Sequence, residues 1–239
     1  MENPTYIALS SQMALQHQMS VVANNLANLS TTAFKGERAL FSQYLVQPPG
    51  NGPLAFVQDV STTRDMREGP LTKTGNPLDL ALQGDGFFVI QTPLGNRYTR
   101  NGHFQLDAQG QIVTSQGYPV LSDGGQPVTV PVGAHDISVG PDGTLSIGRG
   151  ALGKIQAVTF AQPQAVAPAA NGLYVTDQDP QPATATRIQQ GMLEESNVNP
   201  VLELTRMLDV VHANGSIKTF LETEDTRQRN AIDKLSKVS

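Results

Sequence analysis

The chain contains 239 residues, which is enough for one or two domains with a substantial hydrophobic core. Its formal net charge of −5 offers no basic surface to a phosphate backbone, so we expect no nucleic-acid partner. The absence of cysteine excludes disulfides, cysteine-ligated metals and thiol catalysis.

Targeting and anchoring signals are also missing from the sequence. No apolar run approaches the ~18 residues that a membrane span requires. The first residues lack the basic region and apolar core of a secretory signal peptide. We therefore expect a protein that is either cytoplasmic or exported without a cleavable signal peptide, and we expect no lipid anchor.

Residues 1–30 are predicted to form one long helix. Asn3-Pro4 is a favourable start, because asparagine can cap a helix and proline fits its first position. Mainly apolar residues then recur at alternating spacings of four and three, which is typical of a coiled-coil seam. This seam comprises Ala8, Gln12, Leu15, Met19, Val22, Leu26 and Leu29, and a second stripe beside it comprises Ile7, Ala14 and Val21.

Three asparagines near the end of this helix are unusual, because asparagine is a mediocre helix former. They are Asn24, Asn25 and Asn28. One interpretation is a solvated face. The other is a register role, in which Asn24 and Asn28, four residues apart, form hydrogen bonds across a helix–helix interface. The sequence leaves both interpretations open.

The middle of the chain is predicted to change from irregular to β structure. Residues 31–70 look like an irregular connector. Residues 71–187 contain short β-prone runs separated by turn sequences such as Asn101-Gly102 and Asp123-Gly124, which indicate a compact antiparallel sandwich or barrel.

Residues 188–239 are predicted to supply a C-terminal segment and a second long helix. Asn199-Pro200 repeats the helix-start signal, and an apolar stripe follows at helical spacing through Leu204, Leu208 and Val211. Gly215 weakens this helix, but we expect the helix to continue across it.

The predicted fold class is therefore mixed α and β. We expect the N- and C-terminal helices to pair as a coiled coil around an inserted, mainly antiparallel β domain. We expect them to pair through the seam on residues 1–30 and the stripe on Leu204, Leu208 and Val211. Two helices cannot bury all of these apolar stripes, so other chains must cover the rest. The expected subunit-interface residues are Leu15, Met19, Val22, Asn24, Asn25, Leu26, Asn28, Leu29, Leu204, Leu208 and Val211.

No motif in the sequence indicates catalysis. The four histidines are not at metal-ligand spacings. Asp79 and Asp85 could form an acid/base pair, but Asp85 lies between two glycines and is better explained as a turn residue. We therefore expect a protein that is not an enzyme, without catalytic residues, cofactor or metal.

Three segments resemble the bacterial flagellar axial proteins, which form the rod and hook. The first runs Ala-Asn-Asn-Leu-Ala-Asn and ends at Phe34-Lys35, with Ala33 in place of the family's usual glycine. The others are 74–88 with 98–104, and 190–200. The three matches follow the family's order, and the length suits a rod protein better than the longer hook protein.

This resemblance implies a structural subunit of the basal-body rod that crosses the periplasm. It implies self-assembly through the terminal helices into a helical axial tube that transmits motor torque. The implied partners are other rod subunits, proximal and distal, and the flagellar type III export apparatus. The alternative is a secreted β-rich binding module or adhesin, which gives no reason for two helices with matching stripes at opposite ends of the chain.

Overall fold

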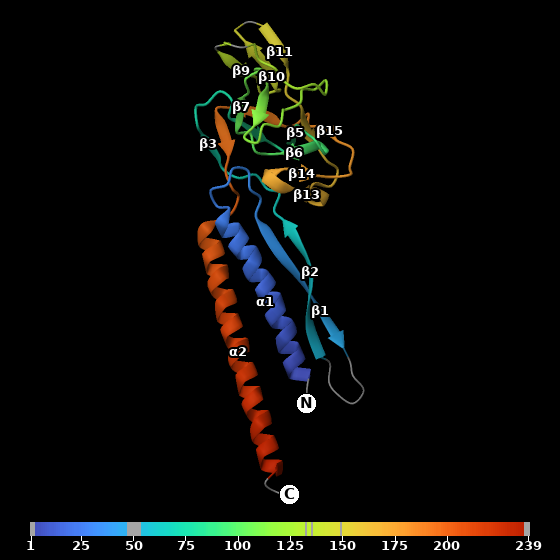
Figure 1. Ribbon diagram of the computed structural model, residues 1–239, viewed down its shortest axis with the longest axis vertical. Coiled ribbons are helices and arrows are strands. Elements are labelled where there is room, and N and C mark those ends of the chain that lie inside the picture. Colours follow the sequence, from blue (N-terminus) through green and yellow to red (C-terminus); the bar gives the residue numbers. More distant parts are fainter. Residues whose placement is uncertain (1–2, 47–53, 132, 135, 149, 237–239) are drawn as a thin grey trace. The chain divides into compact units, whose positions relative to one another are not determined.

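The computed structural model describes residues 3–46, 54–131, 133–134, 136–148 and 150–236 (Figure 1). The chain divides into two compact units. The helical unit contains residues 1–27, 37–65 and 199–239. The β unit contains residues 28–36 and 66–198. Two helices at opposite ends of the sequence therefore flank a mainly antiparallel β region.

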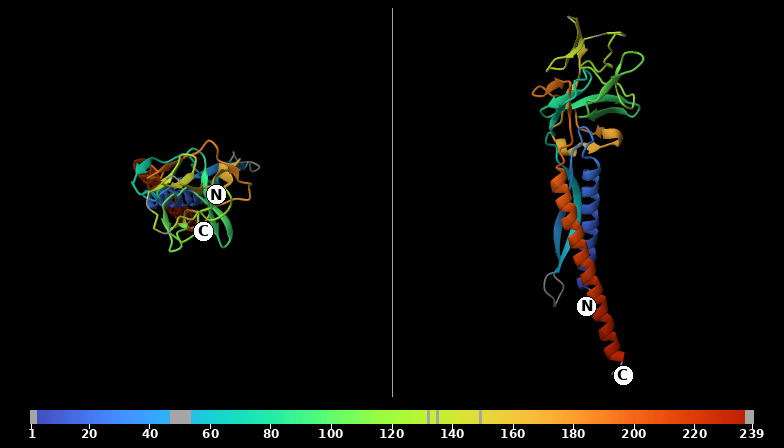
Figure 2. Two further views of the ribbon diagram at one scale, coloured as in Figure 1. Left: turned by 90° about the horizontal axis from the view of Figure 1, so that it is seen from above. Right: turned by 90° about the vertical axis from the view of Figure 1, so that its left-hand side faces the viewer.

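Two long helices dominate the helical unit and lie side by side (Figures 1 and 2). They are α1 (Asn3–Ala27) and α2 (Pro200–Ser236). The side-chain oxygen of Asn199 accepts hydrogen bonds from the backbone N–H of Val201 at 3.0 Å and of Leu202 at 3.2 Å. This is N-capping as the sequence predicted. The prediction of a helix across Gly215 is also confirmed, because α2 is unbroken there.

The face of α2 that packs on α1 differs from the expected one. Val210 is buried, and Ile217 shares a groove with Ile7 and Ala8 of α1. The stripe through Leu204, Leu208 and Val211 is exposed instead. Ala8 is a small, buried residue of α1 that lines this groove, and a small side chain at a helix–helix contact lets the helices approach closely.

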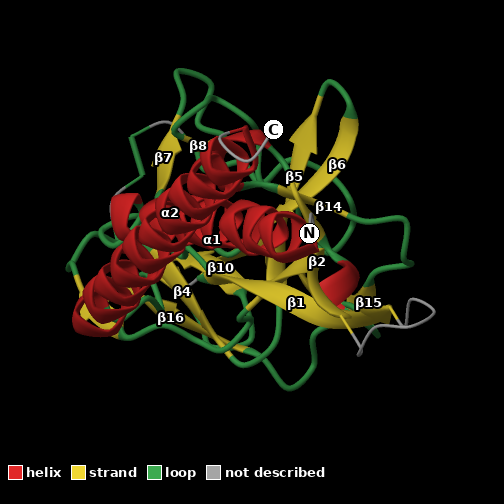
Figure 3. Ribbon diagram, turned by 90° about the horizontal axis from the view of Figure 1, so that it is seen from below, coloured by secondary structure: helices red, strands yellow, loops and turns green. Residues whose placement is uncertain are grey.

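A long β-hairpin completes the helical unit, where the sequence had predicted an irregular connector over 31–70. Strands β1 (Glu37–Val46) and β2 (Leu54–Arg64) pair antiparallel, with a bulge after Leu40. Both strands contact α1 (Figure 3), and Phe41 meets the ring of His17 edge-on, with centroids 6.4 Å apart. The connector prediction was therefore wrong over these strands, because packing against α1 stabilises a hairpin that the local pattern left ambiguous.

The β unit is built from fifteen short strands among its described residues, and every pairing between them is antiparallel. The largest sheet has the order β13-β14-β6-β5-β12-β15, a smaller one has the order β11-β10-β9, and three pairs are β16-β4, β17-β3 and β7-β8. The strands are β3 (Leu71–Lys73), β4 (Leu80–Gln83), β5 (Phe87–Thr92), β6 (Gly95–Thr99), β7 (Phe104–Leu106), β8 (Ile112–Thr114), β9 (Ile137–Val139), β10 (Thr144–Ile147), β11 (Gly150–Lys154), β12 (Ala157–Thr159), β13 (Ala167–Pro168), β14 (Tyr174–Val175), β15 (Gln181–Pro182), β16 (Arg187–Gln190) and β17 (Met192–Glu194).

The core of the β unit lies on both faces of β5. Phe88 and Ile90 belong to one buried apolar cluster, and Phe87 and Val89 belong to another. A strand that is buried on both faces reads as a continuous apolar run, which explains why this segment shows no alternation. The pairs β16-β4 and β17-β3 join the end of the β unit to its beginning, so residues 187–194 close the unit.

Candidate functional site

The first candidate site is an exposed apolar stripe on α2. Leu204, Leu208 and Val211 are 43%, 54% and 49% exposed, and Val201 and Leu202 extend the stripe toward the start of the helix. Large apolar side chains that share one helix face and remain exposed mark a surface for association. The sequence predicted the composition of this stripe but assigned it to the contact with α1.

The predicted interface residues at the N-terminal end differ in exposure. Leu15, Met19 and Leu26 are half-buried, whereas Val22 is fully buried within the helical unit. Helix α1 ends at Ala27, three residues earlier than predicted. Asn28 and Leu29 therefore belong to the loop 28–36 of the β unit, and both are half-buried.

Asn25 makes the hydrogen bonds for which the register hypothesis had named Asn24 and Asn28. Its side-chain N–H donates to the carboxylate of Glu203 on α2 at 3.2 Å and to the backbone oxygen of Glu37 at 2.8 Å. Its side-chain oxygen accepts from the N–H of Glu37 at 2.8 Å. Asn25 is 2% exposed, whereas Asn24 is exposed and donates to the Glu37 carboxylate at 3.4 Å.

Charged partners surround this asparagine within the helical unit. Arg64 pairs with Glu37, and Arg206 pairs with Glu203. We call Asn25, Glu37, Arg64 and Glu203 the helical clamp. It joins α1, both strands of the hairpin and α2 through groups that are largely shielded from water, where hydrogen bonds and ion pairs strengthen one another.

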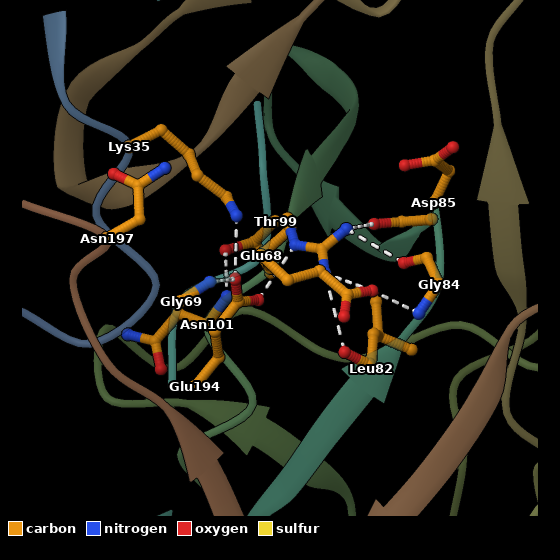
Figure 4. A network of polar contacts seen from close by, with 12 residues as sticks. Lys35, Glu68, Gly69, Leu82, Gly84, Asp85, Thr99, Asn101, Glu194 and Asn197 are labelled. Atoms are coloured by element: carbon orange, nitrogen blue, oxygen red, sulfur yellow. Dashed lines mark hydrogen bonds and ion pairs between the residues drawn. The ribbon is translucent and has the colours of Figure 1, made fainter. Parts of the chain in front are cut away.

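A second polar cluster lies in the interior of the β unit (Figure 4). The Lys35 ammonium contacts Oε1 of Glu194 at 2.6 Å, and Nε of Arg100 contacts Oε2 at 2.8 Å. The side chains of Lys35 and Glu194 are 0% exposed. Arg100 also donates to the carbonyl oxygens of Leu82, Gly84 and Gly86. The guanidinium thus connects the carboxylate to the backbone around β4 and the start of β5.

The same cluster gathers three separate chain segments. Lys35 donates to the backbone oxygen of Arg67 at 2.6 Å, and the N–H of Gly69 donates to Glu194 at 2.9 Å. The Asn197 side chain accepts from the N–H of Gly36 at 2.8 Å and donates to the oxygen of Arg67 at 2.9 Å. We call Lys35, Arg100, Glu194 and Asn197 the β clamp.

Burial and charge oppose each other in the β clamp. Burial, together with the nearby Arg100 cation, lowers the pKa of Lys35 below its ordinary value despite the attraction of Glu194. Burial alone would raise the pKa of Glu194. The Arg100 and Lys35 cations outweigh that effect, aided by the hydrogen bonds from Lys35 and Gly69, and hold the pKa of Glu194 below its ordinary value.

Sequence reasoning missed the β clamp, although a signal was present. Lys35, Arg100 and Glu194 each lie in a different one of the three segments that carry the family resemblance. Ala33, which replaces the usual glycine of that signature, is buried with φ of 57°, so the loop after α1 adopts the left-handed conformation there. Its N–H donates to the backbone oxygen of Glu194 at 2.7 Å.

Asp79 and Asp85, which the sequence had suggested as a conceivable acid/base pair, lie in different environments. Asp79 is buried and bonds the His103 ring at 2.7 Å and the Asn76 amide at 3.1 Å. Asp85 is exposed in the turn before β5, and its backbone oxygen accepts from Thr186 at 2.6 Å. Its place in that turn agrees with the interpretation favoured from the sequence.

The part of the chain that the structure describes contains no candidate metal centre and no membrane-spanning helix. Within it, no group of three or more histidine or acidic side chains is placed to hold a metal ion. None of the described helices combines the length and apolarity that crossing a membrane requires. His135, one of the four histidines, lies outside the described residues.

Three family models match separate parts of the chain. Residues 6–35 match "Flagella basal body rod protein", and residues 81–147 match "Flagellar hook protein FlgE/F/G D1 domain". Residues 189–213 match "Flagellar basal body rod FlgEFG protein C-terminal". These families consist of structural flagellar proteins.

Individual relatives match over almost the whole chain. The flagellar basal-body rod protein FlgF of Caulobacter vibrioides is 38% identical, covering 100% of both chains. The FlgF protein of Mesorhizobium japonicum is 34% identical, again over 100% of both. The rod protein FlgG of Bacillus subtilis is 31% identical over 92% of this chain and 94% of its own. The sequence from Thr223 to Ile232 likewise resembles the proximal-rod protein FlgF more than the distal-rod protein FlgG. The chain therefore belongs to the family of flagellar basal-body rod proteins and is FlgF-like within it.

Proposed function

We propose that the protein is a structural subunit of the flagellar basal-body rod, which assembles through its terminal helices into a helical axial tube and transmits motor torque. The observation that carries this proposal is the exposed apolar stripe on α2 in a chain that matches rod proteins from end to end. A rod subunit must associate with other rod components, and this stripe is a surface suited to that association.

The energetics favour covering the stripe in an assembly. Complete burial of a leucine or valine side chain contributes about 1.5–3 kcal/mol relative to full exposure, and the stripe side chains are about half exposed. Contacts of this kind between unlike surfaces of neighbouring copies are heterologous, and they build a helical tube when the rotation does not close. Torque then passes through many modest contacts.

The proposed subunit interface comprises the residues expected from the sequence. Leu204, Leu208 and Val211 contact a neighbouring subunit directly, together with the accessible parts of Leu15, Met19, Asn24, Leu26, Asn28 and Leu29. Val22 and Asn25 are buried within the helical unit and act by shaping the surface around them. Within one subunit, α1 and α2 pair as a coiled coil, and residues 1–30 with 188–239 act as the rod core domain.

The proposed partners are the proximal and distal rod proteins and the flagellar type III export apparatus. The proposed location is the rod where it crosses the periplasm, which the chain reaches without a cleavable signal peptide. We also propose that the protein has no enzymatic activity. The adhesin alternative is not favoured, because the relatives that match the full length are rod proteins.

Introducing a charge into the stripe tests this proposal. Leu208→Asp would place a carboxylate where a neighbour's apolar surface is expected, whereas Thr205→Asp places the same charge on an exposed position of the same turn that is already polar. Each variant is expressed in cells that lack the native protein, and purified basal bodies are probed for it. We expect Thr205→Asp to be incorporated and Leu208→Asp to be absent. Normal incorporation of Leu208→Asp would contradict the role of the stripe.

A further inference from the structure

The connection between the two units is made by four separate passages of the chain. The backbone passes from one unit to the other after Ala27, after Gly36, after Asp65 and after Val198. Any force that acts on one unit and is resisted by the other must cross these covalent passages. The groups that fasten the backbone beside each passage therefore decide how that force is distributed.

On the side of the β unit, the β clamp fastens the segments that lead into these passages. Lys35 precedes the second passage by one residue, and its Nζ holds the backbone of Arg67, two residues after the third. Asn197 precedes the fourth passage by one residue and holds the backbone N–H of Gly36 and the oxygen of Arg67. Glu194 joins this cluster to the core through Arg100.

In the helical unit, the residues of the helical clamp bond to one another beside the same four passages. Asn25 precedes the first passage by two residues, and Glu37 directly follows the second. Arg64, beside the third passage, pairs with Glu37. Glu203, in the first turns of α2 after the fourth passage, accepts from Asn25. Within each unit, the chain segments next to the passages are therefore joined to one another by one network of polar contacts.

We propose that the β clamp and the helical clamp form a load-sharing joint, in which Lys35, Glu194 and Asn25 divide a force between the units over several backbone segments in parallel. This inference rests on the proposed function, because a rod subunit is the kind of protein that must carry torque. Bonds loaded in parallel fail at a higher force than bonds loaded one after another.

The chemistry of the β clamp supports a role beyond ordinary stability. A fully buried ion pair contributes little net stability compared with apolar packing of similar volume, because both charges lose their hydration. Ion pairs and charge-assisted hydrogen bonds are, however, directional, and water has little access to replace them when they are buried. Such bonds suit the fastening of particular backbone groups, and Lys35, Glu194 and Asn197 all bond to backbone.

Single-molecule pulling of the full chain tests the joint. Because the chain contains no cysteine, two introduced cysteines provide unique attachment points. In the first arrangement, Ala23→Cys on α1 and Leu94→Cys between β5 and β6 place the joint between the handles. In the second, Leu94→Cys and Gln109→Cys place both handles within the β unit. All three positions are exposed.

Lys35→Met is the informative variant, because it removes one cation and leaves the Arg100–Glu194 ion pair intact. We expect it to lower the force of the first rupture about twofold in the first arrangement and to leave the force unchanged in the second. Glu195→Gln changes an exposed neighbour of the clamp and should alter neither force. An equal decrease in both arrangements would show that Lys35 only stabilises the β unit, and no decrease in either would also overturn the proposal.

Asn197→Ala provides a second test that leaves the buried ions in place. It removes the bonds to Gly36 and Arg67, and the same direction-dependent loss of force is expected. Because these measurements use the isolated chain, they are independent of rod assembly. A chain that shows the joint but never enters basal bodies would contradict the proposed function alone.

Discussion

Asn25 of α1 donates a hydrogen bond to the carboxylate of Glu203 on α2 across 3.2 Å, between residues 178 positions apart in the sequence. Both side chains are almost completely buried. The same amide nitrogen also donates to the backbone oxygen of Glu37, and the amide oxygen accepts from the Glu37 N–H, so a single asparagine joins both helices to the hairpin. The stability of the helical unit therefore depends strongly on this position.

Asn25→Ala should destabilise the helical unit by about 2–4 kcal/mol, because it removes the partner of the Glu37 backbone groups and one hydrogen bond of the buried Glu203 carboxylate, which keeps its pairing with Arg206. Hydrogen exchange by mass spectrometry over α1 and β1 measures the loss. Asn24→Ala, one residue away and exposed, is the control and should cost less than about 0.5 kcal/mol. Equal exchange rates in the two variants would show that the buried bonds of Asn25 contribute nothing.

Glu194→Gln should destabilise the β unit in a manner that depends on pH. The pKa of Glu194 is lower in the folded chain than in the unfolded chain. Its ionised form therefore stabilises the fold above the unfolded-state value of about 4.3, and this contribution disappears as pH falls through the folded-state pKa. At pH 7 the variant should lose about 3–5 kcal/mol, because Lys35 and Arg100 lose their shared anion.

Urea unfolding of both proteins between pH 7 and pH 3, followed by circular dichroism, measures this difference. It should shrink as pH falls below about 4.3, because the unfolded chain then binds a proton on this carboxyl group that the folded chain takes up only at lower pH. Glu195→Gln, at the exposed neighbouring position, should show only a small difference at pH 7. A constant difference for Glu194→Gln across this range would rule out a stabilising charge at Glu194.

Gly102→Ala should destabilise the β unit by at least about 3 kcal/mol. A Cβ atom at Gly102 would lie 1.6 Å from the backbone oxygen of Leu80, and the backbone there is held by the hydrogen bond from the Leu80 N–H to the Gly102 oxygen. Gly153→Ala is the matched control, because its Cβ would meet no atom within 4 Å. Thermal unfolding should show a large decrease in the first melting temperature and almost none in the second.

Gly215→Ala should stabilise α2 by about 1 kcal/mol, since glycine in a helix interior costs that amount relative to alanine. The added Cβ meets no atom within 4 Å. The reverse change at an exposed position of the same helix, Ala231→Gly, should destabilise it by a similar amount. Circular dichroism at 222 nm during heating compares the two. A decrease in helix content for Gly215→Ala would mean that this glycine permits a bend that α2 requires.

The helices and the antiparallel strands could be predicted because their signals are local. The 4,3 periodicity and the Asn199-Pro200 start indicated α2, and turn sequences separated the strands. The same periodicity could not decide which of two adjacent stripes faces α1. That choice depends on how α2 packs against a helix at the other end of the sequence, so Leu208 was assigned to the wrong side.

The clamps were beyond local prediction for the same reason. Lys35 and Glu194 are 159 residues apart, and no spacing rule connects them. The β1–β2 hairpin was missed because its stability depends on packing against α1, which a local sequence pattern does not reveal. The asparagine cluster indicated a polar contact, but only the path of the chain shows that Asn25 is its buried member.

The run of large apolar residues in β5 has a consequence for strand alignment. Since Phe87 through Ile90 are apolar on both sides, sliding the strand by one residue would still bury hydrophobic side chains, and the pattern alone cannot prevent it. Arg100 directly follows the partner strand β6. Its guanidinium donates hydrogen bonds to the carbonyl oxygens of Gly84 and Gly86, which immediately precede β5 in the chain. These hydrogen bonds from the Arg100 guanidinium therefore favour one register of β5 against β6.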